Sequence, residues 1–184
     1  MSTNVRIGLV AVMLIVASGA FAASAYTSGS VERSANVNVV NDDTGLIALQ
    51  DGTSGDLVFQ NATGALAIDF TAGGAGGANT AAHYELGDPA NANTSYAFNL
   101  TNLDAESHDF TVAYSGSDGQ DTDANIEFQV YDSTGTLVDT ANEEGTSASL
   151  SGVASGETLY VVIVVDTHGL DSTADLSGTL TISA

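Results

Sequence analysis

Cysteine and lysine are both absent from this chain of 184 residues. Without cysteine the chain has neither a disulfide framework nor a thiolate metal site. Its length suits one domain around one hydrophobic core. Without lysine, only Arg6 and Arg33 stand as permanent cations against 23 acidic residues. Such a surface repels nucleic acid and anionic lipid, because both need Lys or Arg to release counterions. We therefore expect no nucleic-acid partner.

The acidic balance also indicates the kind of host. If the first 25 residues are removed on export, 23 acids face Arg33 alone and the formal charge is −22. Self-repulsion on this scale strains a compact fold, and molar salt relieves it by cutting the Debye length to about 3 Å. The composition favours a halophilic host; an acidic protein from an ordinary organism is the alternative.

Signatures of catalysis are scarce. The histidines are His83, His108 and His168, and none belongs to an H-E-x-x-H pair. No G-x-S-x-G nucleophile motif occurs. The run GAGG at residues 74–77 lacks the lysine of a phosphate-binding loop. We predict no enzymatic activity, no cofactor and no zinc site, with each histidine on the surface.

Calcium is supported better by the sequence than zinc. Asp118, Asp121 and Asp123 could supply hard carboxylate oxygens at a loop tip. An EF-hand does not fit, because Ile126 stands where that loop needs glycine. We expect a solvated acidic turn here and keep calcium as the alternative.

The N-terminus has the pattern of an export signal. Arg6 precedes an apolar stretch at residues 7–17, expected to be helical, and Ala23-Ser24-Ala25 is an A-x-A cleavage pattern. We predict cleavage between Ala25 and Tyr26, leaving a secreted chain with no membrane contact. The alternative is an uncleaved anchor, but serine and glycine dilute the span, and crossing a bilayer takes about 20 predominantly apolar residues.

Period-two alternation recurs along the exported part, and no helical period is sustained. The apolar members lie at residues 35–39, 66–70, 96–100, 110–114, 126–130 and 180–182. Residues 159–165 (LYVVIVV) form a continuous apolar run, typical of a strand covered on both faces. Roughly eight to ten short strands separated by turns predict an all-β antiparallel sandwich. Residues 72–80 (AGGAGGANT) predict a glycine-rich surface loop.

Three N-glycosylation sequons begin at Asn61, Asn93 and Asn99. Asn99 lies between Phe98 and Leu100, which we expect to point inward, so its side chain should face solvent. We expect modification of at least one of the three.

The strand expected near the cleavage site needs a partner. Val37 and Val39 alternate with Asn36 and Asn38, and their backbone groups need hydrogen bonds. Either this strand pairs within its own sandwich, or it leaves its domain and completes the sheet of a neighbouring copy. A head-to-tail contact that does not close into a ring builds a filament.

Several blocks resemble a known family. They are AFAASAY at the signal end, VNVVNDDTGLIAL at residues 37–49, YAFNLTNLDAESHDFTVAY at residues 96–114, and IEFQVYDSTG, GVASGETLYVVIVVDTHGL and DLSGTLTISA in that order. The chain resembles the TasA/camelysin-like secreted family, in particular its haloarchaeal branch and the archaeal bundling pilins. The resemblance implies a jelly-roll-like sandwich and polymerisation by donation of an N-terminal strand. Some relatives carry a metallopeptidase name, which no zinc motif here supports.

On this basis we expect a signal peptide at residues 1–25, a donor strand and linker at residues 26–40 and a sandwich domain at residues 41–184. The donor residues would be Tyr26, Val31, Val37 and Val39. From hydrophobicity alone, the acceptor groove is assigned to Phe110, Val112, Phe128, Val162 and Val164.

The expected function is that of a structural subunit of an extracellular filament that serves adhesion or biofilm cohesion. Its partner would be other copies of itself, with surface-layer proteins or neighbouring filaments as further partners. One alternative is a monomeric secreted binding module, although the absence of tryptophan argues against sugar stacking. The other alternative is a membrane-anchored envelope protein that keeps its signal segment.

Overall fold

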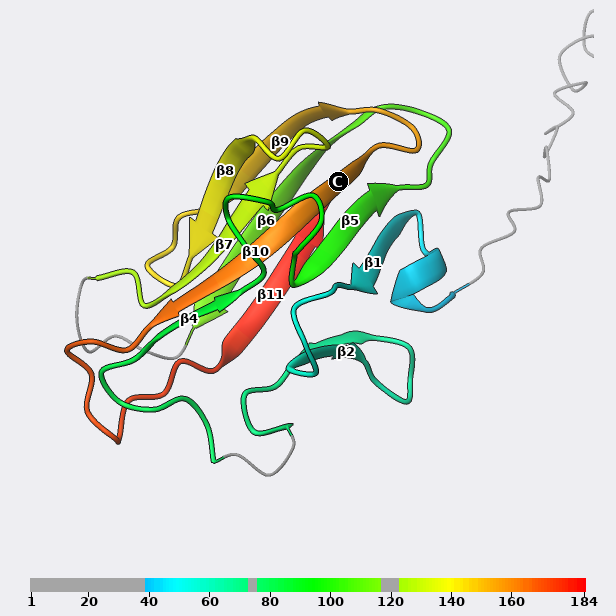
Figure 1. The fold of residues 1–184 in the computed structure, drawn as a ribbon. Coiled ribbons are helices and arrows are strands. Elements are labelled where there is room, and N and C mark those ends of the chain that lie inside the picture. Colours follow the sequence, from blue (N-terminus) through cyan, green and yellow to red (C-terminus); the bar gives the residue numbers. More distant parts are fainter. Residues whose placement is uncertain (1–38, 73–75, 117–122) are drawn as a thin grey trace, which may run out of the picture. The chain divides into compact units, whose positions relative to one another are not determined.

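The computed structural model describes residues 39–72, 76–116 and 123–184, which form an antiparallel β-sandwich (Figure 1). The all-β class predicted from the alternation is confirmed. The predicted signal helix, the cleavage site at Ala25 and Tyr26, and the donor residues Val31 and Val37 lie outside the described residues. Val39 is described, and it lies in no strand and is 98% exposed.

The larger sheet is built around β10. Its strand order is β1 (Ile47–Asp51), β5 (Phe98–Asn102), β10 (Thr158–Asp166), β7 (Ile126–Tyr131) and β8 (Leu137–Asn142). The short β4 (His83–Leu86) pairs with the second half of β10, while β5 pairs with the first half. Every pairing is antiparallel.

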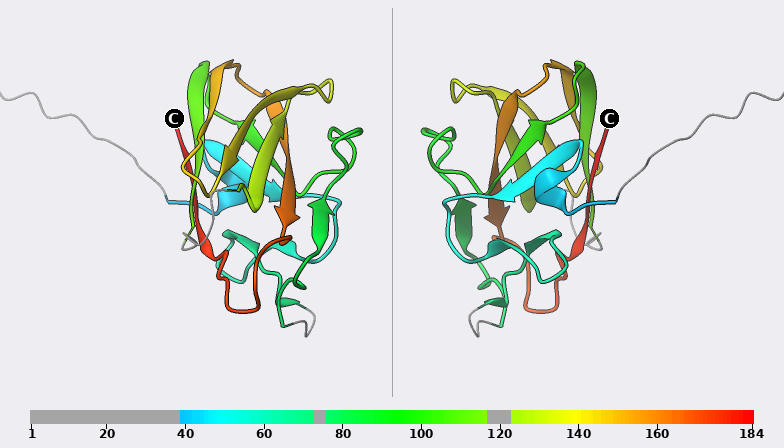
Figure 2. Two further views of the ribbon diagram at one scale, coloured as in Figure 1. Left: turned by 90° about the vertical axis from the view of Figure 1, so that its left-hand side faces the viewer. Right: turned by 90° about the vertical axis from the view of Figure 1, so that its right-hand side faces the viewer.

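The smaller sheet faces the larger one and has the order β11 (Gly178–Ser183), β6 (His108–Gly116) and β9 (Ala148–Val153). A separate hairpin of β2 (Val58–Gln60) and β3 (Leu66–Ile68) follows β1. One 3₁₀ turn, η1 (Asp42–Thr44), precedes β1. Figure 2 shows the two sheets as separate layers.

The core between the sheets is formed by alternate residues of both layers. Its fully buried large side chains include Phe98, Phe110, Phe128, Leu100 and Leu150. Burial of a side chain of this size stabilises the fold by about 1.5–3 kcal/mol. The prediction for residues 159–165 is also confirmed: Val161 and Ile163 belong to this core, whereas Val162 packs on the opposite face of β10 against Ala92 and Tyr131.

The two long sides of the sandwich differ. On one side, β8 leads directly into β9 across a short turn, so the chain joins the two sheets. On the other side, the larger sheet ends at β1 and the smaller one ends at β11, and among the described residues β11 pairs only with β6. The sandwich is therefore open between β1 and β11.

Among the described residues, no helix is long and apolar enough to cross a membrane.

Asn102 links the end of β5 to the smaller sheet and to the turn that follows β5. It is fully buried, and its Nδ2 donates to the carbonyl oxygens of Glu106 at 2.8 Å and Val153 at 2.9 Å, while its Oδ1 accepts from the N–H of Asp104 at 3.0 Å. Its amide thus satisfies three backbone groups that would otherwise lose their partners.

We predict that Asn102→Ala lowers the free energy of unfolding by about 2–4 kcal/mol, because it leaves buried backbone groups unpaired. Chemical denaturation in molar salt, followed by circular dichroism, measures this difference. A loss below about 1 kcal/mol would contradict a structural role for this side chain.

Candidate functional site, an apolar groove on the open side of the sandwich

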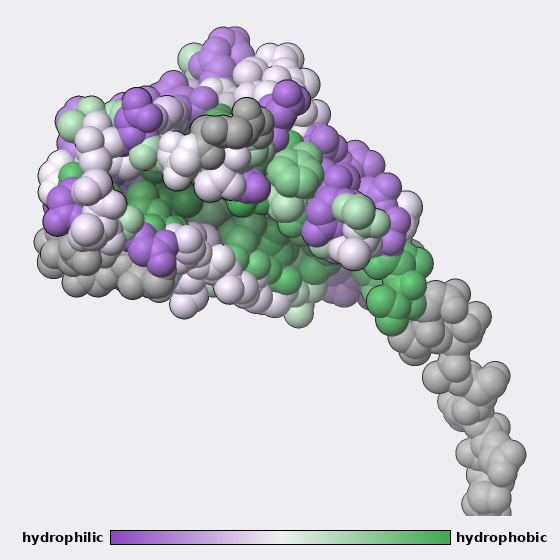
Figure 3. Space-filling model, turned by 90° about the horizontal axis from the view of Figure 1, so that it is seen from below, coloured by the Kyte–Doolittle hydropathy of each residue, from purple (hydrophilic) through white to green (hydrophobic). Residues whose placement is uncertain are grey.

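A groove of about 830 Å³ occupies the open side of the sandwich. One wall is formed by β11 and the segment before it, and the other by β1, β3 and the residues that follow β3. Figure 3 views this side from below and shows hydrophobic residues gathered in the hollow, with polar residues around its rim. The groove therefore exposes part of the inter-sheet core to solvent.

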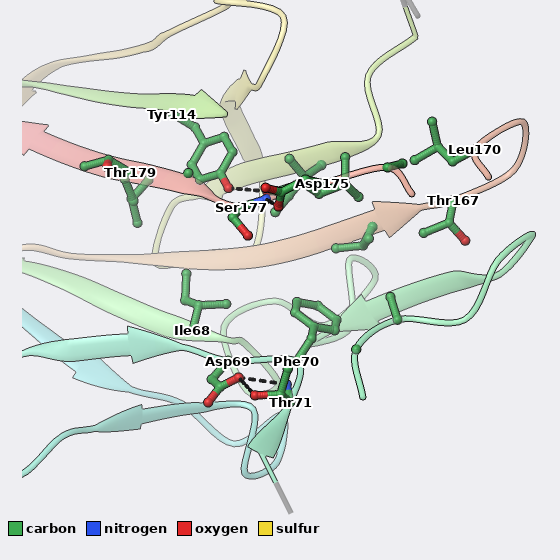
Figure 4. Close-up of a pocket in the computed structure, with 18 of the residues that line it drawn as sticks. Ile68, Asp69, Phe70, Thr71, Tyr114, Thr167, Leu170, Asp175, Ser177 and Thr179 are labelled. Atoms are coloured by element: carbon green, nitrogen blue, oxygen red, sulfur yellow. Dashed lines mark hydrogen bonds between the residues drawn. The ribbon is translucent and has the colours of Figure 1, made fainter. Parts of the chain in front are cut away.

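The floor of this groove is apolar, and its rim is polar (Figure 3). Phe128, Ile126, Val165 and Tyr114 are core residues that also line the groove. Partly buried residues complete the apolar surface: Leu49, Leu66, Ile68, Phe70, Leu176, Leu180 and Ile182. Figure 4 shows Ile68 and Phe70 pointing from their wall toward the one that carries Tyr114 and Asp175. An apolar hollow with a polar rim is a candidate binding surface.

The edge strand β11 alternates along this groove. Leu180 and Ile182 turn toward the core and the groove, while Thr181 and Ser183 are exposed on the other face; Thr179 is exposed and also borders the groove. Because β11 pairs only with β6 among the described residues, its second edge presents backbone N–H and C=O groups for another strand. The groove thus offers both a backbone edge and an apolar face.

A close contact fixes the start of β11. The hydroxyl of Tyr114 on β6 donates to the carbonyl oxygen of Leu176 at 2.6 Å. A Cβ atom added at Gly178 would lie 2.6 Å from the Tyr114 hydroxyl oxygen and 2.4 Å from the carbonyl oxygen of Ser115. No side chain fits at Gly178 without displacing the backbone, so glycine lets this end of the groove wall lie against Tyr114.

Carboxylates gather at the end of the groove near Gly178. Asp69 lies on one wall, and Asp171 and Asp175 lie on the other. The Oδ1 atoms of Asp69 and Asp171 accept from the hydroxyls of Thr71 and Thr173, each at 2.6 Å. These hydrogen bonds lower the pKa of both carboxyl groups, so both remain charged at neutral pH.

The opposite end of the opening is more apolar. A second cavity of about 190 Å³ lies there, lined by Leu46, Ile47, Phe110 and Ala184 among others. Since Ile47 begins β1 and Ala184 follows β11, this cavity continues the gap between the two edge strands. The opening therefore has Asp69, Asp171 and Asp175 toward Gly178. The other carboxylates that line it are engaged within the chain: Asp42 accepts from the N–H of Leu66, and Asp104 is bonded to His108.

The residues predicted to line the acceptor groove lie in three different places. Phe128 lines the groove. Phe110 and Val112 are buried in the inter-sheet core, with Phe110 reaching only the smaller cavity. Val162 and Val164 lie on the opposite face of β10. Hydrophobicity alone did not separate residues that line an opening from residues that fill a core.

The three histidines each contact a carboxylate. Nδ1 of His168 lies 2.6 Å from Asp166, Nδ1 of His83 lies 3.7 Å from the same carboxyl group, and Nε2 of His108 lies 2.5 Å from Asp104. Hydrogen bonds from His168 lower the pKa of Asp166, and the bond with His108 lowers that of Asp104. Within residues 39–72, 76–116 and 123–184, no group of three or more acidic or histidine side chains is arranged to hold a metal ion.

The proposed calcium residues Asp118 and Asp121 lie outside the described residues, and Asp123 is exposed. Asn125, which follows them, is buried: its Nδ2 donates to the carbonyl oxygen of Asp166 at 2.9 Å, and its backbone N–H donates to the carboxylate of Glu143. It therefore serves to anchor β7 to β10.

Asn99 corrects one prediction. It is 8% exposed, although the alternation placed it toward solvent. Its strand β5 lies between β1 and β10, so the Asn99 side chain is flanked by Gln50 and Tyr160 on the neighbouring strands. By contrast, Asn93 is exposed, with its Nδ2 3.3 Å from the carbonyl oxygen of Ser133, and Asn61 is partly buried in a tight turn.

Comparison with protein-family models and with curated proteins found no match for this chain.

We predict that a glycan is found at Asn93 and not at Asn99 when the folded protein is modified in its host, because a glycan cannot be accommodated at a buried amide. Glycopeptide mass spectrometry of the native protein, compared with an Asn93→Gln variant, measures occupancy at each site. A glycan attached to Asn99 would show that β5 is accessible during modification and would contradict the prediction.

Proposed function

We propose that this protein is the structural subunit of an extracellular filament, in which residues 26–40 of one copy add a strand to β11 of the next. The observation that carries this proposal is the open side of the sandwich, where an apolar groove lies beside the edge of β11 that no other described strand pairs. A strand inserted there would cover the exposed core and pair the free backbone groups at once.

The sequence of the proposed donor matches both faces that such a strand would have. Val37 and Val39 share one face, which would meet Leu180 and Ile182 in the groove. Asn36 and Asn38 share the other, which would extend the exposed face where Thr179, Thr181 and Ser183 lie. Alternation of this kind is what an edge position in a half-buried sheet requires.

The chain length before the sandwich is sufficient for this exchange. An extended segment of 15 residues spans up to about 50 Å, whereas six residues, the length of β11, span about 20 Å. Each copy carries one donor segment and one groove, so the contact is head to tail. Repetition without closure of a ring gives a filament.

A monomeric binding module is the second candidate. In that case the same segment would fold back into the groove of its own domain, and the open side would vanish without a partner. The chemistry of the filled groove is identical in the two cases, so the state of assembly decides between them.

We predict that Ile182→Arg abolishes filament formation, because it places a charge on the apolar wall that the donor must cover. The matched control is Thr181→Arg, which adds the same side chain to the exposed face of the same strand. Polymerisation of the full exported chain in molar salt is followed by light scattering and negative-stain electron microscopy, with circular dichroism to verify folding.

We expect filaments from the wild type and from Thr181→Arg. For Ile182→Arg we expect at least a tenfold reduction in the amount of polymer, which corresponds to a loss of about 1.4 kcal/mol or more of association free energy at each contact. A wild-type chain that remains monomeric would favour the binding module. Filaments formed equally well by both variants would exclude this groove as the site of assembly.

A further inference from the structure

The described sandwich has no permanent positive charge. Both arginines of the chain, Arg6 and Arg33, precede residue 39, and lysine is absent. If the first 25 residues are removed, Arg33 is the one permanent cation of the exported protein, and it lies within the proposed donor segment. The groove that we propose as its acceptor is meanwhile lined at one end by Asp69, Asp171 and Asp175.

The position of Arg33 in the sequence decides which face of an extended donor would carry it. In an extended strand, residues two apart share a face, so Arg33 would share a face with Val31, Ala35, Val37 and Val39. Insertion of these valines into the groove necessarily directs Arg33 toward the groove as well. Among apolar residues alone the guanidinium would lose water without gaining a counter-charge, so the strand fits best where Arg33 meets the carboxylates at the groove rim. Of these, Asp171 and Asp175 are exposed and Asp69 is half-buried.

We propose that Arg33 of the donor strand pairs with the acidic end of the groove in the next copy, and that this pairing fixes the register and direction of the inserted strand. This inference rests on the proposed function. Arginine suits the role, because its planar guanidinium offers five donors to more than one carboxylate.

The acidic end sets a definite alignment. With Arg33 alongside Leu176, Ala35 falls beside Gly178, Val37 beside Leu180 and Val39 beside Ile182, and the donor runs parallel to β11. The smallest inward donor residue then lies beside Gly178. The two valines follow toward the apolar end, near Leu49 and Leu66.

The absence of cysteine allows this register to be read by disulfide trapping. Leu180→Cys is combined in turn with Ala35→Cys, Val37→Cys or Val39→Cys in the full exported chain, and the products are separated without reductant. A disulfide forms only when the two Cα atoms lie within about 7 Å, so neighbouring registers are distinguished. We expect a ladder of covalent multimers for the pair with Val37→Cys, exceeding the other two pairs by about tenfold.

The matched control for Arg33 exchanges two adjacent residues. Arg33→Ser combined with Ser34→Arg keeps the composition and the net charge but moves the guanidinium to the outward face of the strand. We expect this exchange to remove the preference for the Val37→Cys pair. Asp69→Asn, Asp171→Asn and Asp175→Asn, made together, should have the same effect from the groove side.

The outcomes separate this inference from the proposed function. Multimers that form with the same preference in the exchange variant would overturn the role of Arg33 and leave the filament proposal in place. A ladder dominated by another cysteine pair would overturn the proposed register. Cross-links confined to single chains, or none from any pair, would overturn the filament proposal and with it the role of Arg33.

Discussion

The constraint on which this structure depends is the incomplete smaller sheet. Among residues 39–72, 76–116 and 123–184, three strands face six, and no strand fills the gap between β11 and β1. On the opposite side the chain closes the sandwich itself by continuing from β8 into β9. The core residues Phe128, Ile126 and Val165 are therefore enclosed from three sides and reach the groove on the fourth. Any partner that completes the fold must supply both an apolar face and a backbone edge.

Charge and hydrophobicity act over different distances on this molecule. The acidic surface keeps copies apart through long-range repulsion, which molar salt reduces to contact distance. In the proposed filament the groove would supply short-range attraction that salt strengthens rather than screens, since excluded salts favour burial of apolar surface. Asp69 and Asp171 line the groove, and hydrogen bonds from neighbouring threonine hydroxyls lower the pKa of both carboxyl groups. In saline conditions, association through the groove is thus compatible with solubility elsewhere.

The alternation in the sequence predicted the strands whose inward residues are large. Strands β6, β7 and β10 were predicted, because Phe, Val and Ile recur there at every second position or without a break. Strand β9 (ASLSGV) has small residues between Leu150 and Val153, and β8 exposes both Leu137 and Val138, so neither shows a clear two-residue period. Period alone also cannot tell whether a second face is covered, which is why Asn99 was placed in solvent. The groove walls could not be predicted from the sequence. Their residues, from Leu49 to Ile182, are far apart along the chain and are brought together only by the sheet topology.

The absence of lysine and arginine from residues 39–184 has a consequence for the proposed filament. Proteases that cleave after basic residues find no site anywhere in the sandwich. In the exported chain their one target is the bond after Arg33, in the segment that links one subunit to the next in the proposed filament. Strand exchange would enclose that bond, so the assembled polymer would be resistant to this whole class of enzymes, while an unassembled subunit would lose its connecting strand in a single cut.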